Sequence, residues 1–232
     1  MKQSMWCLSV RRWSALALAV AVPFFSARGA TYTVVNTNDT GVGSLRWAIL
    51  AIQSNPPPNE IQFNIPGPGP HTIKVVDILP FITNSVSVLG NTQPGYTGTP
   101  VVTVLGPTTN FLDYGVVISG PNVLVRGLRV SGFTQLDYGT GISIGGHPGQ
   151  QVAGCVVDGN FNGIIAQGGL VGGTSTNDRN IIINNVNGIW TVTGSTAVIR
   201  GNFIGVEADG VTAAGNQNGI RTFYTSGLHI QG

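Results

Sequence analysis

Charged residues are scarce in this chain. Asp, Glu, Lys and Arg make up 9% of its 232 residues, against roughly 25% in an average globular protein. This shortage argues against a coiled coil, a helical bundle and a charged disordered tail, which all rely on charged side chains. Cysteine is also rare, with two residues in all, so we expect no disulfide framework.

Glycine, in contrast, is abundant. The chain contains 34 glycines, about twice the usual share of roughly 7%. Asn, Thr and Ser take the place of the missing charges, and Val and Ile supply most of the apolar content. This composition is typical of short β-strands separated by turns.

The first 29 residues are organised like a secretory signal. Basic residues at positions 2, 11 and 12 precede a mostly apolar run at 13–25, and the small residues of Ala27-Arg28-Gly29 follow. The apolar run is too short to cross a bilayer as a helix. We therefore expect residues 1–29 to be a signal peptide, and the mature protein to be secreted or at the cell surface, without a transmembrane span.

Removal of this segment changes the net charge. It holds four of the eleven basic residues and none of the nine acidic ones, so the charge goes from +2 to −2. The mature chain then lacks the basic footprint of a nucleic-acid-binding protein, and no nucleic-acid partner is expected. Cys7 is removed as well, which leaves Cys155 without an intrachain partner and predicts that it is a small buried core residue.

One short amphipathic helix is predicted near the start of the mature chain. Ser44 is a suitable N-cap, and Leu45, Ala48, Ile49 and Ile52 recur at helical spacing. The helix should end before the prolines at 56–58. Around it, β-prone runs separated by Pro/Gly turns predict strands at 31–36, 60–65, 72–76, 85–89 and 101–105.

From residue 116 onward the sequence is periodic. The triplet Asn-Gly-Ile begins at residues 162, 187 and 218, with a weaker copy at Gly141-Ile142. A second motif, with Gly or Arg followed by apolar or Asn positions, begins at residues 127, 154, 179 and 201. Two motifs that recur together indicate a solenoid. Since strand alternation excludes helical repeats, we predict an all-β fold, a right-handed parallel β-helix with coils about 4.8 Å apart.

Such a stack aligns equivalent residues in columns. The motifs predict the three columns Leu128/Cys155/Asn180/Asn202, Val130/Val157/Ile182/Ile204 and Ile142/Ile164/Ile189/Ile220, the last as the main interior aliphatic stack. Gly and Asn are expected at the corners, because they tolerate left-handed backbone angles. Stacked Asn side chains can also bond along the ladder.

These patterns divide the chain into three parts. Residues 1–29 form the signal peptide, residues 30–115 the N-terminal cap and first irregular coils, and residues 116–232 the β-helix repeats. The predicted helix would cover the apolar end of the solenoid. The last five residues, 228–232, align with the start of another coil, so we expect the protein to continue into further C-terminal repeats or domains.

Two stretches carry a family resemblance. TNDTGVGSLRWAILAIQSNPPPNEIQFNIPGPGPHTI, with NTQPGYTGTPV after it, resembles the N-terminal segment of bacterial surface and secreted proteins with a CSLREA-type domain, in a variant without the leading Cys. RNIIINNVNGI and IRGNFIGVEADGVTAAGNQNGI resemble repeats of the pectin-lyase-like, right-handed parallel β-helix superfamily. The resemblance implies the fold. It does not imply one activity, because that superfamily includes lyases, hydrolases, epimerases and adhesins.

Insertions mark one corner of the repeats as a candidate binding face. Extra residues at 134–138 and at about 207–215 fall at the same corner, and solenoid insertions gather on binding faces. They bring Asp137, Tyr138, Glu207 and Asp209 as candidates. These side chains have three interpretations, as ordinary turn residues, as Ca²⁺ or ligand contacts, or as catalytic groups.

An outward column is the second candidate site. If the column of Ile164 and Ile189 points inward, alternation places Ile165, Trp190 and Arg221 on three successive coils of an outer face. An outward Trp beside an Arg suits stacking on a sugar ring or a protein contact. The alternative is that a loop or a neighbouring chain covers it.

The remaining basic residues and the histidines give weaker indications of a functional site. Arg126 and Arg200 are placed in one outward column with Asp178 between them, which predicts an Asp178–Arg200 ion pair and leaves Arg126 without an acidic neighbour. Three histidines at unrelated positions predict no copper or zinc site.

The sequence therefore favours an exported β-helix scaffold that binds a polysaccharide or cell-surface glycan, without a cofactor apart from the Ca²⁺ alternative. The other interpretation is a polysaccharide lyase or glycoside hydrolase. An enzyme requires two converging carboxylates, or a carboxylate with a free base, whereas a scaffold does not.

Overall fold

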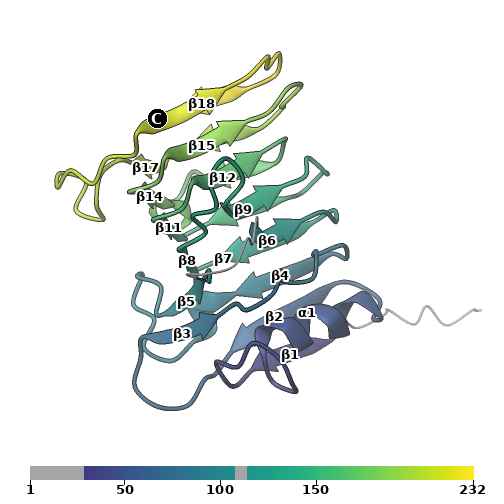
Figure 1. Ribbon diagram of the computed structural model, residues 1–232. Coiled ribbons are helices and arrows are strands. Elements are labelled where there is room, and N and C mark those ends of the chain that lie inside the picture. The colour runs from purple at the N-terminus through teal and green to yellow at the C-terminus, as the bar shows by residue number, and fades with distance from the viewer. Residues whose placement is uncertain (1–28, 108–113) are drawn as a thin grey trace, which may run out of the picture.

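The computed structural model describes residues 29–107 and 114–232 and shows a parallel β-solenoid of about seven turns (Figure 1). One short α-helix lies at its N-terminal side. The predicted all-β parallel solenoid is therefore confirmed. The predicted signal peptide, residues 1–29, lies outside the described residues except for Gly29.

Three parallel sheets, A, B and C, form the faces of the solenoid, and neighbouring strands within each are paired in parallel. Sheet A extends over the whole stack, whereas sheet C begins only at residue 114. Sheet A has eight strands: β1 (Thr31–Val34), β2 (Asn59–Phe63), β4 (Val86–Leu89), β7 (Val123–Arg126), β10 (Gln151–Ala153), β13 (Leu170–Gly172), β16 (Val198–Arg200) and β19 (His229–Gln231). Sheet B has six: β3 (His71–Lys74), β5 (Val102–Leu105), β8 (Arg129–Ser131), β11 (Val156–Asp158), β14 (Ile181–Ile183) and β17 (Phe203–Ile204). Sheet C has five: β6 (Tyr114–Ile118), β9 (Thr140–Ile144), β12 (Asn162–Ala166), β15 (Asn187–Thr191) and β18 (Asn218–Thr222). From β4 on, the chain visits the sheets in the order A, B, C, so each coil has an A–B, a B–C and a C–A corner.

The registers confirm all three predicted columns. Ile164 pairs with Ile142 and Ile189, and the column continues to Ile220. Val157 pairs with Val130 and Ile182 in the same way. These inward side chains form one continuous core with less than 5% exposure over most of its length, and Cys155 belongs to it as predicted, at 1% exposure.

Asparagine ladders join the coils inside two of the corners. At the A–B corner the amide of Asn180 accepts from the Cys155 backbone N–H at 2.9 Å and donates to Asn202 at 2.9 Å. At the B–C corner Asn185 links Asn160 to Asn216 in the same manner. Each ladder satisfies backbone groups that the turns would otherwise leave buried without partners.

The glycines of the two motifs have different physical causes. Gly127, Gly154 and Gly201 have φ between +60° and +70°, the left-handed conformation expected at the corners. The glycines of the Asn-Gly-Ile triplets are not left-handed. A Cβ at Gly163 would lie 2.5 Å from the carbonyl oxygen of Gly188 on the next coil, so close stacking of the coils, rather than backbone angle, requires glycine there.

The helix α1 (Leu45–Gln53) matches its prediction. The side chain of Ser44 accepts the N-cap bond from Trp47 N–H, and the four predicted apolar residues are the buried ones. They pack into the core beside β1 and β2, at the N-terminal end of the stack (Figure 1). Within the described residues no helix is both long and apolar enough to cross a membrane.

Candidate functional site

A pocket lies where two long A–B corners bracket two short ones. The chain needs only Gly127-Leu128 to pass from β7 to β8, and only Gly154-Cys155 to pass from β10 to β11. The coil before them inserts residues 90–101 between β4 and β5, and the coil after them inserts residues 173–180 between β13 and β14. The insertions stand on either side of the short corners and border an open cavity of ≈ 430 Å³, which we call the corner pocket.

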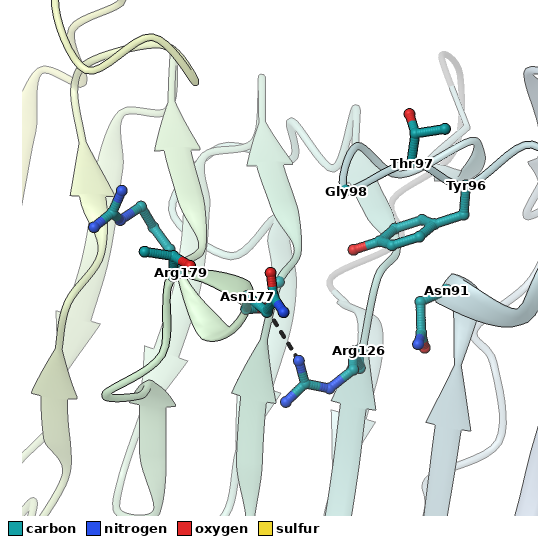
Figure 2. Close-up of a pocket in the computed structure, with 9 residues that line it drawn as sticks. Asn91, Tyr96, Thr97, Gly98, Arg126, Asn177 and Arg179 are labelled. Carbon is teal, nitrogen blue, oxygen red and sulfur yellow. Dashed lines mark hydrogen bonds between the residues drawn. The ribbon is translucent and has the colours of Figure 1, made fainter.

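The walls of the corner pocket supply an aromatic ring, guanidinium groups and amides. The lining residues that carry this chemistry are Asn91, Tyr96, Arg126, Asn177 and Arg179. Figure 2 shows the Tyr96 ring reaching from one wall into the gap, with Arg126 and Asn177 on the other side of it. Gly154 lies between the walls, where a Cβ would come 2.8 Å from the Asn177 carbonyl oxygen and 3.8 Å from the Tyr96 hydroxyl.

Tyr96 is held by its own loop. Its backbone N–H donates to the carbonyl of Gln93 at 3.1 Å, and Gln93 is buried. Partial burial raises the pKa of the Tyr96 hydroxyl, an effect that Cys155 reinforces and Arg126 opposes. The hydroxyl therefore stays protonated at neutral pH and can donate a hydrogen bond into the pocket.

Arg126 bridges the pocket to its second wall. One terminal nitrogen donates to the carbonyl oxygen of Asn177 at 3.0 Å (Figure 2), and the other donates to the carboxylate of Asp178 at 2.6 Å. The prediction that Arg126 has no acidic neighbour is therefore wrong. The predicted Asp178–Arg200 pair is wrong too, because Arg200 pairs in register with Gly172 and Asp178 lies in the insertion that follows. The 3₁₀ turn η2 (Thr176–Asp178) forms where the motif alignment predicted a strand.

Two further residues that line the corner pocket are Arg179 and Asn91. The guanidinium of Arg179 lies 4.1 Å above the centre of the Phe203 ring, and its Nε donates to the Gly201 carbonyl. The side-chain oxygen of Asn91 is buried and has no hydrogen-bond partner among the described residues. The pocket thus presents mainly hydrogen-bond donors, whereas the Asn91 oxygen is shielded from the cavity.

The outward column of sheet C has the predicted membership. Ile165 pairs with Trp190, and Trp190 pairs with Arg221. The Arg221 guanidinium carbon lies 5.3 Å from the centre of the Trp190 ring, within the range of a cation–π contact. Trp190 and Ile165 are half-buried and Arg221 is exposed. The structure brings these three side chains together on one face, away from the corner pocket.

The candidates at the B–C corner are turn residues in the structure. Asp137 has a left-handed backbone (φ 68°), and Tyr138 beside it is exposed. Asp209 accepts bonds from the Thr212 hydroxyl and from the backbone N–H groups of Val211 and Thr212, which lower the pKa of its carboxyl. Between Glu207 and Asp137, no hydrogen bond or ion pair forms in the described part of the chain. No group of three His, Cys, Asp or Glu side chains in that part is arranged to hold a metal ion.

Little in the sequence pointed to the corner pocket. Its walls lie in QPGYTGTP and GTSTND, which resemble ordinary turns, and the pocket depends on their standing on different coils of the same corner. The one usable signal was the unequal length of successive A–B connections. No protein-family model matches the chain, and no curated protein matches it.

Proposed function

We propose that this protein is an exported β-solenoid scaffold that binds a polysaccharide in the corner pocket. One observation carries the proposal. The 90–101 insertion and the end of β7 place the Tyr96 ring and the Arg126 guanidinium on facing sides of a ≈ 430 Å³ cavity, and the 173–180 insertion adds Asn177 and Arg179 to its lining. Export is supported by the signal-like sequence of residues 1–29.

The lining suits a sugar. Carbohydrates offer hydroxyl groups that both donate and accept, and apolar ring faces that pack on aromatic side chains. Tyr96 supplies a ring and a hydroxyl donor, and the exposed side-chain amide of Asn177 can both donate and accept. The volume falls within the range of ≈ 300–1,000 Å³ that is usual for small-ligand sites.

Binding is favoured over the lyase or hydrolase alternative by the chemistry of the lining. Hydrolysis of a glycosidic bond needs two carboxyl groups about 5–9.5 Å apart. Among the described residues, those that line the pocket include no Asp or Glu. The adjacent carboxylate, Asp178, is held by Arg126. We therefore propose a scaffold for glycan attachment at or outside the cell surface.

A polysaccharide panel tests the proposal. The protein is titrated by affinity gel electrophoresis against laminarin, xylan, alginate and chondroitin sulfate, as are Tyr96→Ala and Arg126→Gln. Tyr224→Ala is the matched control, because Tyr224 is an exposed tyrosine at a C–A corner and belongs to neither candidate site. We expect at least one polysaccharide to retard the protein, and both pocket variants to weaken that retardation about tenfold while the control does not. Retardation that is equal in all four proteins would place binding elsewhere.

A further inference from the structure

The wall of the corner pocket that carries Tyr96 is anchored by a buried amide. Gln93 is 2% exposed. Its side-chain oxygen accepts from the backbone N–H of Ile65 at 2.8 Å, and its side-chain nitrogen donates to the backbone carbonyl of Ile65 at 2.8 Å. A flipped amide would place oxygen against oxygen and N–H against N–H, so these two bonds fix which end of the amide is the donor.

That orientation determines the tautomer of a buried histidine. The Nε2 atom of His71 lies 3.1 Å from the side-chain nitrogen of Gln93. Because this Gln93 nitrogen is a donor, His71 Nε2 must be the acceptor, and the imidazole is neutral with its proton on Nδ1. His71 is 7% exposed, and its backbone is fixed where β3 pairs with β5.

Gln93 also sets the position of Tyr96. The backbone N–H of Tyr96 donates to the Gln93 carbonyl, and Gln93 N–H donates to Gly90. Movement of Gln93 therefore moves the turn from 93 to 96, and with it the tyrosine ring that lines the pocket. His71 and Gln93 act on the pocket as positioning residues, since neither lines it.

We propose that neutral His71 holds the Tyr96 wall in place, and that protonation of His71 releases it. A proton on Nε2 would face the N–H₂ group of Gln93 in a site shielded from water, and two donors cannot satisfy each other there. The amide cannot adapt by flipping, because Ile65 holds both of its ends. The turn from 93 to 96 must shift instead, which opens the corner pocket on that side.

No neighbouring charge offsets this effect. The elements in contact with His71 are β5, through Val102, and the 90–101 loop, through Gln93. Lys74 on its own strand is exposed on the outer face, as is Glu60 on β2. β5 and the loop carry no ionisable side chain other than Tyr96. In the described part of the chain, His71 forms no ion pair. If the corner pocket binds polysaccharide as proposed, the protein would retain it at neutral pH and release it in acid.

The experiment needs no ligand, so its outcome does not depend on the proposed function. Nitrogen-15 NMR at pH 7.5 reads the tautomer directly, and we expect Nε2 of His71 to be unprotonated. Amide exchange is then measured at pH 7.5 and 5.0 and expressed as protection factors. We expect protection of the Tyr96 and Ile65 amides to fall at least tenfold at pH 5.0, with Ile164 in the distant core unchanged. An Nε2–H tautomer, or equal protection at both pH values, would overturn the proposal.

Two variants separate this histidine from the others. Asn at position 71 keeps a side-chain acceptor and does not titrate, so His71→Asn should keep its protection at pH 5.0. His147→Gln removes an exposed histidine at a C–A corner and should show the same acid response as the unmodified protein. A loss of protection in His71→Asn as large as that of the parent would also refute the assignment. Should that variant fail to fold, the tautomer measurement and the parent's own pH comparison still decide.

Discussion

Asp178 accepts a 2.6 Å hydrogen bond from Arg126, which lies 52 residues earlier in the chain, and this pair joins separate coils across a corner of the solenoid. Both side chains are about one-fifth exposed, so the pair contributes modestly to stability, about 1 kcal/mol or less. We expect Asp178→Asn to lower the free energy of unfolding by that amount in urea titrations. A double-mutant cycle with Arg126→Gln should give a coupling energy of the same size. A coupling energy indistinguishable from zero would mean that the backbone of η2 keeps this wall of the corner pocket in place without the Arg126–Asp178 pair.

A substitution at Gly154, which lies between the two walls of the corner pocket, should narrow the pocket. Gly154→Ala places a Cβ 2.8 Å from the Asn177 carbonyl oxygen and near the Tyr96 hydroxyl. Gly194 has a similar positive φ, and a Cβ there would have no other atom within 4 Å. In both alanine variants, backbone strain should lower the free energy of unfolding by about 1 kcal/mol. Only Gly154→Ala should also be retarded less by polysaccharide. Equal retardation of the two variants would argue that the space around Gly154 is not part of the binding site.

The core was predictable from sequence because stacking repeats it. Ile142, Ile164 and Ile189 recur with their neighbours at similar spacing, and the in-register ladder converts that spacing directly into contacts. The helix was predictable for a local reason, since Ser44 and the apolar spacing specify both its start and its buried face. Neither inference required knowledge of where distant loops lie.

The corner pocket could not be predicted in the same way. Asp178 precedes the Arg179-Asn180 motif directly, so alignment of motifs placed it in a strand, whereas it lies in an inserted turn. The strand that pairs with β16 ends at Gly172 instead. A repeat alignment fixes the motif and leaves the length of each corner free, and the pocket is made entirely from differences in corner length.

Interrupting a buried asparagine ladder should lower the free energy of unfolding substantially. Asn185 donates to the carbonyl oxygens of Val157 and Ile183 and accepts from the backbone N–H of Asn160. Asn185→Ala leaves these groups buried without partners, and we expect a loss of about 2–4 kcal/mol in urea unfolding. Asn177→Ala is the control, since that side chain is exposed and should change stability by less than about 0.5 kcal/mol. Similar losses of stability in the two variants would mean that water molecules take over the hydrogen bonds of the Asn185 side chain.

The outward face of sheet C remains a second predicted glycan contact. Trp190→Ala removes the ring that Arg221 covers, and we expect it to weaken retardation by the polysaccharide panel severalfold, since aromatic stacking is lost. Phe223→Ala removes an exposed aromatic ring from the same end of the solenoid and should leave retardation unchanged. Unchanged binding in Trp190→Ala would remove this face from consideration and leave the corner pocket as the proposed site.

Cys155 should make the stability of the solenoid depend on alkaline pH. Burial raises the pKa of its thiol from 9.0 to about 11. Because the folded pKa is the higher one, the thiol's contribution is fully present below pH 9, and it is lost as the pH rises toward 11, where the unfolded chain ionises first. Two pKa units correspond to about 3 kcal/mol. Urea unfolding at intervals from pH 8 to 11 should show this decline, and Cys155→Ala should have a shallower slope even if its stability is lower throughout. Tyrosines also titrate in this range, so the difference in slope between the two proteins is the quantity to compare, and identical slopes would mean that the thiol is not shielded from water.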